Sequence, residues 1–486
     1  MTTDSTRSDN TRSDNTTTDD MTTDGMTTDP VTTAFLRESA DPHSPLHTVL
    51  EEISLPPALA AAAGNRLLSR PLFAPQQAVD RAVADTAGVF ELITSLPQRL
   101  FDGDLDAYCR ALGIDERTQK LITRLGGGAP PMYGRTDMSF DGSRFRLLEF
   151  NIASELGGID RAGTLPRLWA QAPGFTSFSA EHALTYLDTG RLVAETLRAA
   201  ARPVAGARTP VVALLEAPGG LAKFGAVWEA VAELMRAEGL DFRVGEVHAV
   251  RSRGKRITLD GTAVDLVLRC FCAEEILAEP DGEAMVEPLF QAHEQGTVVL
   301  WTPLESYLFS NKGALALLSR PRLRDRFSAE ELALIDRLLP WTRSLPHQAR
   351  TSAPDLFAEC LARQHELILK PRAQYGGSGV LAGWETPAGP WRRALESVDA
   401  CGAVVQERAH TRPEPVLDPA TGRTEDWRTV WSLFLTPDGH AGTYARALPA
   451  DAGAVVGMGA DQRACTAGVF TFEAADWPGD NSATGV

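Results

Sequence analysis

The sequence predicts a mixed α/β (α+β) protein that contains a small parallel sheet and a separate β-hairpin. Between residues 209 and 300, Val211–Leu215 reads as an apolar strand, Phe224–Glu238 as an amphipathic helix and Val264–Leu268 as a further strand. Strands that alternate with helices form parallel sheets. Within residues 134–151, a glycine turn joins two strand-like runs, which predicts the hairpin.

Composition and charge argue against two classes of partner. The chain has 486 residues and a net charge of −17, whereas a nucleic-acid partner requires a basic surface, so we expect none. No apolar run approaches the roughly 18 residues of a membrane span. The N-terminus lacks the basic-then-apolar layout of a secretion signal. The six cysteines are scattered, and we expect a cytoplasmic protein with reduced thiols.

The N-terminal part of the chain divides into a tail and a helical region. Residues 1–33 repeat TRSDN and MTTD and contain few apolar residues, so we expect disorder there. Residues 34–125 are mainly helical in pattern. One helix ends near Gly64, and Pro97 is expected to break another.

The hairpin gathers the most informative polar side chains. Its arms are Gly134–Phe140 and Arg144–Asn151, joined by a turn in which Gly142 is free to adopt positive φ. With a three-residue turn, Arg135 lies opposite Glu149, and Asp137 lies one step along. Side chains alternate along a strand, so four polar groups share one face: Arg135, Asp137, Glu149 and Asn151.

This face combines two carboxylates and an amide with a guanidinium group. Carboxylate and amide oxygens suit a hard cation, and arginine suits phosphate oxygens. A solvated strand face with an ordinary cross-strand ion pair is the alternative. Glu149 and Asn151 flank Phe150 and follow Leu147 and Leu148, which favours a mostly buried strand.

A second group of residues resembles a nucleotide clamp. Lys370 ends the apolar strand Leu367–Leu369, and the strand Ala403–Glu407 carries Gln406 at its edge. Between them lies a small-residue loop whose backbone N–H groups can approach phosphate closely. The loop residues are Gly376, Gly377, Ser378 and Gly379.

Two further stretches lie where phosphate could bind. Ser310 or Asn311 caps a predicted helix, and Lys312 falls in its first turn, where the helix dipole makes a lysine mildly unfavourable. Local structure therefore does not explain Lys312. Residues 217–220 lie where a strand meets a helix but lack the dinucleotide fingerprint, so we expect no dinucleotide there.

Six motifs together resemble one family, the circularly permuted ATP-grasp ligases, and are similar to the synthetase domain of glutathionylspermidine synthase. No amidase half of the kind fused to that synthetase is present, and the first hundred residues match no part of it. The motifs are GRTD (134–137), LLEFN (147–151), VDLVLR (264–269), SNKGALALL (310–318), LKP with YGGSGV (369–380) and VVQE (404–407).

The resemblance implies roles for individual residues. Asp137, Glu149 and Asn151 would hold Mg²⁺, and Arg135 would stabilise the transferring phosphoryl group. Lys312 and Lys370 would contact ATP phosphates beneath the loop at 376–379. Further implied contacts are Gln406 and Glu407 near adenine or ribose, and Arg269 and Arg446 at the substrate.

These expectations divide the chain into six regions. They are a tail (1–33), a helical region (34–125), the hairpin with following helices (126–203), the parallel α/β domain (204–300), the nucleotide-binding part (301–476) and a loose tail (477–486).

The activity that the resemblance implies is an ATP-dependent carboxylate–amine ligase. It would form an acyl phosphate that an amine then attacks, releasing ADP and phosphate. An amino acid or short peptide is the expected donor. A small-molecule kinase on the same scaffold and a non-catalytic nucleotide-binding protein are the alternatives. The sequence specifies neither the two substrates nor the oligomeric state.

Overall fold

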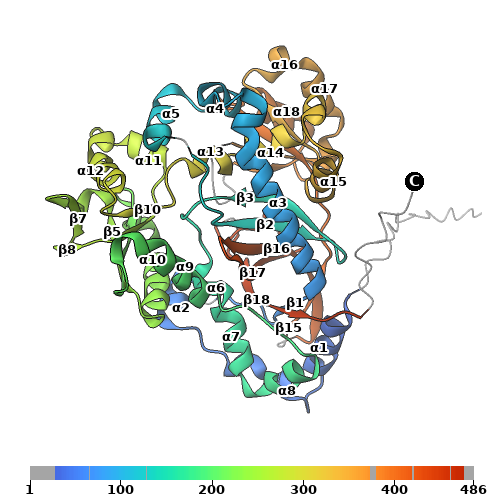
Figure 1. Ribbon diagram of the computed structural model, residues 1–486. Helices are drawn as coiled ribbons and strands as arrows, with labels where there is room; N and C mark the ends of the chain where they lie inside the picture. Colours follow the sequence, from blue (N-terminus) through green and yellow to red (C-terminus); the bar gives the residue numbers. More distant parts are fainter. Residues whose placement is uncertain are drawn as a thin grey trace, which may run out of the picture.

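A large sheet forms the centre of the molecule (Figure 1). The computed structural model describes residues 28–64, 66–126, 128–372, 379–418, 421–459 and 461–475. The seven strands of the sheet run in the order β1-β18-β17-β16-β2-β3, and β15 pairs with β16 outside this path. Their bounds are β1 (Leu72–Pro75), β2 (Gly134–Phe140), β3 (Phe145–Asn151), β15 (Glu414–Asp418), β16 (Arg423–Thr436), β17 (Gly439–Pro449) and β18 (Cys465–Phe472).

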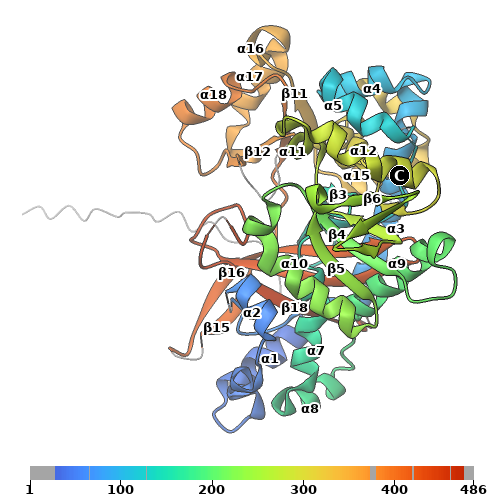
Figure 2. The ribbon, with the colours of Figure 1, turned by 90° about the vertical axis from the view of Figure 1, so that its left-hand side faces the viewer.

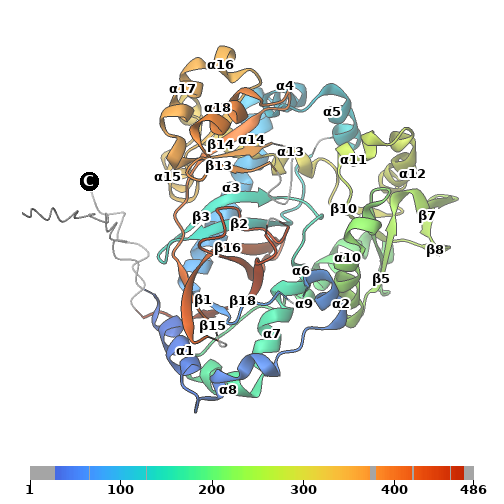
Figure 3. The same ribbon diagram turned by 180° about the vertical axis from the view of Figure 1, so that it is seen from behind.

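Two four-stranded sheets flank the large one, with the parallel sheet on one side and the antiparallel sheet above it (Figures 1 and 3). The first has the order β10-β9-β4-β5 and is parallel throughout. The second, β11-β14-β12-β13, is antiparallel. Their bounds are β4 (Val211–Glu216), β5 (Asp241–Glu246), β9 (Leu266–Arg269), β10 (Val299–Trp301), β11 (Thr342–Leu345), β12 (Leu367–Pro371), β13 (Leu381–Ala382) and β14 (Ala403–Glu407). A small antiparallel sheet adds β6 (Arg251–Arg253), β7 (Arg256–Leu259) and β8 (Thr262–Ala263).

Helices cover the sheets and connect them. The long helix α3 crosses the large sheet in Figure 1, and α10 lies against the parallel sheet in Figure 2. The N-terminal helices are α1 (Pro30–Ala40), α2 (Pro57–Ala63), α3 (Gln76–Phe101), α4 (Leu105–Leu112) and α5 (Glu116–Ile122). The central helices are α6 (Ile159–Ala162), α7 (Thr164–Gln171), α8 (Pro173–Glu181), α9 (Thr189–Ala205), α10 (Gly220–Ala237), α11 (Ala273–Ala278) and α12 (Gly282–Glu294). The remaining helices are α13 (Ser306–Ser310), α14 (Lys312–Leu318), α15 (Ala329–Leu338), α16 (Ala349–Ser352), α17 (Pro354–Ala362) and α18 (Ala388–Glu396).

The predicted hairpin is present, but its register differs from the prediction. Arg135 pairs with Asn151, and Asp137 pairs with Glu149. A β-bulge between Asp137 and Met138 adds Leu148 as an extra residue on β3. The turn also holds four residues, since Phe140 pairs with Phe145. The predicted pairing of Arg135 with Glu149 is therefore wrong, because it assumed a three-residue turn and a ladder without a bulge. The four polar residues still belong to the paired ends of the two strands.

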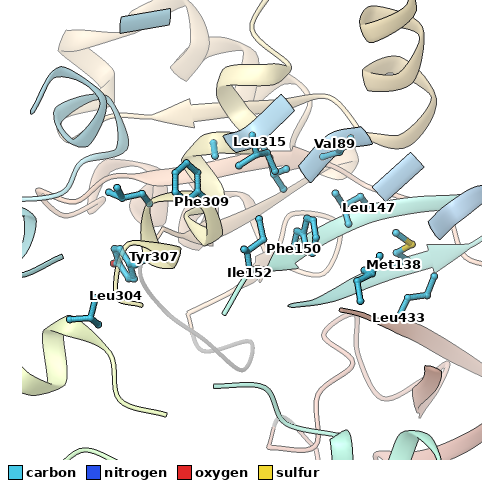
Figure 4. Packing of buried hydrophobic residues seen from close by; sticks show 14 of the residues in the cluster. Val89, Met138, Leu147, Phe150, Ile152, Leu304, Tyr307, Phe309, Leu315 and Leu433 are labelled. Carbon is cyan, nitrogen blue, oxygen red and sulfur yellow. The ribbon is translucent and has the colours of Figure 1, made fainter. Parts of the chain in front are cut away.

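The opposite face of the hairpin packs into the main hydrophobic core. Met138, Leu147 and Phe150 are at most 3% exposed. Figure 4 shows these side chains beside Val89 of α3 and Leu315 of α14. Burial of such side chains stabilises each by about 1.5–3 kcal/mol. This packing fixes the hairpin, and with it the polar groups on its other face.

Three expectations for the N-terminal region need correction. Helix α1 starts at Pro30, capped by the Asp29 side chain, so the predicted tail to residue 33 is too long. Helix α3 continues through Pro97 to Phe101, because a proline one turn from the end removes only one helical hydrogen bond. Residues 72–75 form the strand β1, although they lie in the region that was expected to be mainly helical. Gly64 ends α2 in the left-handed conformation, as predicted.

The predicted division along the chain describes sequence order only. Strands from the predicted regions 34–125, 126–203 and 301–476 all join the large sheet, so these regions are not separate in space. The parallel sheet at 204–300 is confirmed. Residues 1–27 and 476–486 lie outside the described part. Among the described residues, no helix is both long enough and apolar enough to cross a membrane. The six cysteines, which all lie in described segments, form no disulfides.

Candidate functional site

Asp137 lies at the centre of a buried group of charges on the large sheet. Its carboxylate accepts hydrogen bonds from Arg135 Nε at 3.1 Å and from Ser432 Oγ at 2.8 Å. Arg446 Nη2 of β17 lies 2.7 Å from Asp137 Oδ2. Burial alone would raise the pKa of Asp137, but the two guanidinium groups outweigh burial and hold the pKa below its usual value. Asp137 is therefore ionised at neutral pH.

Glu149 pairs with a lysine that approaches from α14. Lys312 Nζ lies 2.9 Å from Glu149 Oε1, and the lysine side chain is 7% exposed. Asn311 is the N-cap of α14, where its side chain accepts a hydrogen bond from the Gly313 N–H at 2.8 Å. Asn311, one of the two predicted caps, is thus the one used. The position of Lys312, unfavourable for the helix alone, is compensated by this carboxylate.

Lys370 reaches the same hairpin from the antiparallel four-stranded sheet. Its Nζ donates to Gln406 Oε1 at 2.6 Å and to the Leu148 carbonyl at 3.0 Å. Burial lowers the pKa of Lys370 to about 8, partly opposed by the charge of Glu149. Leu148 is the bulge residue of β3. The bulge therefore supplies a contact that joins the two sheets.

These residues form one charge cluster with an excess of positive charge. We use that name for Arg135, Asp137, Glu149, Lys312, Lys370 and Arg446. The four cations and two carboxylates leave a net charge of +2 when all six are ionised. Buried charges are costly unless they are compensated. An anion that entered the cluster would offset this excess.

The oxygen atoms of the cluster fit a hard cation by their chemistry. Asp137 pairs directly with Glu149, and Asn151 lies at the end of the same strand. Carboxylate and amide oxygens are the ligands that Mg²⁺ prefers. In the described residues, no three His, Cys, Asp or Glu side chains gather into a metal site. Each carboxylate is instead occupied by a cationic side chain, which an incoming Mg²⁺ would have to replace.

Gln406 and Glu407 lie at the junction between two sheets. Gln406 is 1% exposed and accepts the hydrogen bond from Lys370. Glu407 forms an ion pair with Arg363 at 2.8 Å. Glu407 also lines a cavity of about 420 Å³, together with Arg146 and Pro340. The cavity therefore lies beside the strand that carries Gln406, between β3 and the chain that leaves β14.

Arg269 and Arg446 were both expected at the substrate, and the structure separates them. Arg446 belongs to the charge cluster. Arg269 Nε donates to the Thr302 carbonyl at 2.8 Å, its Nη2 donates to Ser306 Oγ at 3.0 Å, and Nη2 also lies 2.9 Å from Glu155. Arg269 also donates to the Phe271 carbonyl. Arg269 is thus used mainly to hold backbone at the end of the parallel sheet.

The predicted phosphate loop is described only in part. Gly376, Gly377 and Ser378 lie outside the described residues. Gly379 is described and has a φ of +67°, in the left-handed region that favours glycine.

Sequence reasoning did not identify Ser432 or Leu148 as members of the site. Ser432 is completely buried, and it pairs across the sheet with Asp137. The sequence does mark Ser432, because it is a lone hydroxyl residue within the apolar run of β16. Leu148 contributes only its backbone carbonyl, and a backbone contact cannot be predicted from the pattern of side chains.

Comparison with known proteins shows a shared fold. No family model and no curated protein sequence matches the chain. The structure is similar to that of a glutathione synthetase-like effector, GSS30, from Globodera pallida in its apo form. The TM-score is 0.52 at 14% identity, over 92% of this chain and 99% of the other.

Two other solved structures are more distant. A protein described as a gamma-glutamylcysteine synthetase from Methylobacillus flagellatus has a TM-score of 0.39 at 14% identity, over 75% of this chain and 83% of the other. D-alanyl-alanine synthetase A from Vibrio cholerae has a TM-score of 0.24 at 13% identity, over 47% and 68%. The chain therefore shares its mixed α/β fold with the synthetase-like effector.

Proposed function

We propose that this protein is an ATP-dependent ligase that joins a carboxylate to an amine, with the architecture of a circularly permuted ATP-grasp enzyme. The observation that carries the proposal is the charge cluster, in which two buried lysines and two largely buried arginines surround two carboxylates. Mg-ATP matches both features of the cluster. Its phosphates offset the excess positive charge, and its metal ion takes carboxylate and amide oxygens as ligands. The fold shared with a glutathione synthetase-like protein supports the same class of reaction.

The residues divide between two ends of the nucleotide. Lys312 and Lys370 would contact the phosphates, because their ammonium groups are already held beside the hairpin. The ribose and base would occupy the cavity beside Glu407. Gln406 stands between these two ends and is bonded to Lys370. This arrangement needs no movement of the strands that carry these residues.

Asp137, Glu149 and Asn151 would hold Mg²⁺. When bound, the metal ion would neutralise phosphate charge and polarise the transferring phosphoryl group. Lys312 would then be free to leave Glu149 for a phosphate oxygen. Arg135 and Arg446 would likewise leave the Asp137 carboxylate to the metal ion and turn to phosphate oxygens.

Chemistry explains why ATP is needed. Hydroxide is a poor leaving group, so a carboxylate does not acylate an amine directly. Transfer of the γ-phosphoryl group to the carboxylate gives an acyl phosphate, and attack by the amine then releases phosphate and forms the amide. Arg135 and Arg446 would stabilise the charge that develops on the transferring group. An amino acid or a short peptide is the proposed donor.

The test is ADP release with Mg-ATP across pooled amino acids, short peptides and amines, with mass spectrometry of the products. ADP together with a product mass equal to donor plus acceptor minus water is the expected result. ADP with a stable phosphorylated product would replace the ligase with a kinase on the same site. Absence of both ATP binding and ADP release would contradict the proposal.

A further inference from the structure

A continuous chain of buried polar groups leads from the backbone of one sheet to Lys370. Thr342 Oγ1 of β11 donates to the Pro340 carbonyl at 2.8 Å and accepts from Gln406 Nε2 at 3.2 Å. Gln406 Oε1 accepts from Lys370 Nζ at 2.6 Å, and the same Nζ donates to the Leu148 carbonyl at 3.0 Å. Thr342 and Gln406 are each 1% exposed, so water does not substitute for these contacts.

The direction of each hydrogen bond in this chain follows from its first member. A proline carbonyl can only accept, so the single hydroxyl proton of Thr342 is committed to Pro340. The free lone pair of Thr342 must then face a donor, which is the amide nitrogen of Gln406. The amide oxygen of Gln406 is thereby turned toward Lys370. The opposite amide orientation would set two donors, an NH₂ and an ammonium group, against each other.

We propose that Thr342 is a positioning residue for Lys370, acting through the amide of Gln406. Its hydroxyl accepts from the amide N–H and so holds the amide in the orientation that offers an acceptor to the ammonium group. Thr342 and Gln406 are cross-strand partners on β11 and β14, so the sheet itself holds them in register. Thr342 touches neither nucleotide nor substrate in this arrangement. Only the role of Lys370 at phosphate rests on the proposed function.

The charge state of Lys370 makes this arrangement measurable. Burial lowers the pKa of Lys370 to about 8, Glu149 and Asp137 raise it, and Lys312 lowers it further. An acceptor bonded to the ammonium form favours the proton. Loss of the Gln406 acceptor should therefore lower the pKa of Lys370 again.

The test is the pH dependence of Lys370 acetylation in the full-length protein, quantified by peptide mass spectrometry after a brief pulse of acetic anhydride. Thr342→Val keeps the side-chain shape and removes the hydroxyl. We expect its labelling midpoint to fall by about one pH unit, the order of one hydrogen bond to a charged group. Thr342→Ser restores the hydroxyl and should return the midpoint to that of the wild type.

Two further variants make the test specific. Thr86→Val removes a buried hydroxyl that donates to the Ala82 carbonyl of α3 at 2.6 Å, and it should leave the midpoint unchanged. Gln406→Glu fixes an anionic acceptor beside Lys370 and should raise the midpoint. A midpoint in Thr342→Val equal to that of the wild type, or no recovery in Thr342→Ser, would overturn the proposal.

Nucleotide binding separates this inference from the proposed function. At pH 8, Thr342→Val should weaken ATP affinity about fivefold, because fewer molecules carry a charged Lys370. If the wild type binds no ATP, the proposed function fails, and the acetylation midpoints still decide the role of Thr342. If ATP binds and the midpoints do not differ, the positioning role fails alone.

Discussion

Two regions of the molecule gather buried charges, and they use arginine in different ways. In the charge cluster, Arg446 contacts the carboxylate of Asp137, which we propose as a ligand of Mg²⁺. At the carboxyl edge of the parallel sheet, Arg269 donates to the carbonyls of Thr302 and Phe271, and it also contacts Ser306 and Glu155. On the proposed function, Arg446 exchanges its carboxylate partner for a ligand, whereas the backbone contacts of Arg269 hold the fold together.

The two regions also differ in the sign of their excess charge. Cations outnumber carboxylates in the charge cluster. Around Arg269, the electrostatic neighbours of Glu216 include Glu155 and Glu275, so acidic groups prevail there. A polyanion such as ATP is therefore expected at the first region only.

The largest expected effect comes from Glu149→Gln, which removes one charge from the cluster without changing its shape. ADP formation should fall about a thousandfold, because several kcal/mol of charge stabilisation are lost. The melting temperature should also fall, because the buried Lys312 loses the carboxylate that compensates its charge, so ADP formation is measured well below that temperature. Glu287→Gln on α12, which pairs with Arg124 at a distance from the cluster, is the matched control. ADP formation at the wild-type rate in Glu149→Gln would remove this residue from the site.

The two arginines provide a direct test of the comparison itself. Arg269→Met should lower the free energy of unfolding by about 3 kcal/mol, because several buried acceptors lose their donor. Arg446→Met should cost about 1 kcal/mol, since Arg135 still compensates Asp137, while ADP formation falls about a hundredfold. Urea unfolding and turnover measured on both variants separate the two roles. Equal losses of stability would mean that the two regions do not differ as described.

A smaller effect is expected from Glu216, whose Oε1 accepts from the Trp228 indole N–H. Burial raises the pKa of Glu216 to about 7 from its ordinary value of 4.5. The folded protein thus binds a proton that the unfolded chain has released between pH 4.5 and 7, and stability falls as pH rises through this window. Glu216→Gln should remove this dependence and stabilise the protein at pH 8 by about 1–2 kcal/mol. Urea unfolding of both proteins at pH 5 and pH 8 measures this dependence. The same change in the free energy of unfolding with pH in Glu216→Gln and the wild type would refute the shifted pKa.

Local pattern predicted the elements of the site better than their contacts. The strand positions of Asp137, Glu149, Lys370 and Gln406 follow from alternation and turn chemistry, and the structure confirms those strands. The bulge at Leu148 was not predicted, because one extra residue in a ladder leaves no compositional trace. Together with a turn of four residues instead of three, it moved the partner of Arg135 from Glu149 to Asn151.

Contacts between segments that are far apart in the chain could not be predicted from the sequence. Pairing of β1 with β18 joins residues nearly 400 positions apart, for example Leu72 with Val469. The approach of Lys312 to Glu149 likewise depends on how α14 packs against the hairpin. The role of Thr342 depends on the donor and acceptor order of three side chains. Such facts are properties of packing, which a single sequence does not display.

Calorimetric titration of the full-length protein with ATP in the presence of Mg²⁺ tests the central claim most directly. The account predicts one nucleotide site per chain, with affinity strongly reduced in Lys370→Met and weakened when Mg²⁺ is withdrawn. Lys223→Met, which removes a lysine that lies over the Phe224 ring on α10, should bind as the wild type does. Binding of ATP to Lys370→Met with undiminished affinity, or no binding to the wild type, would contradict the assignment of the charge cluster as a nucleotide site.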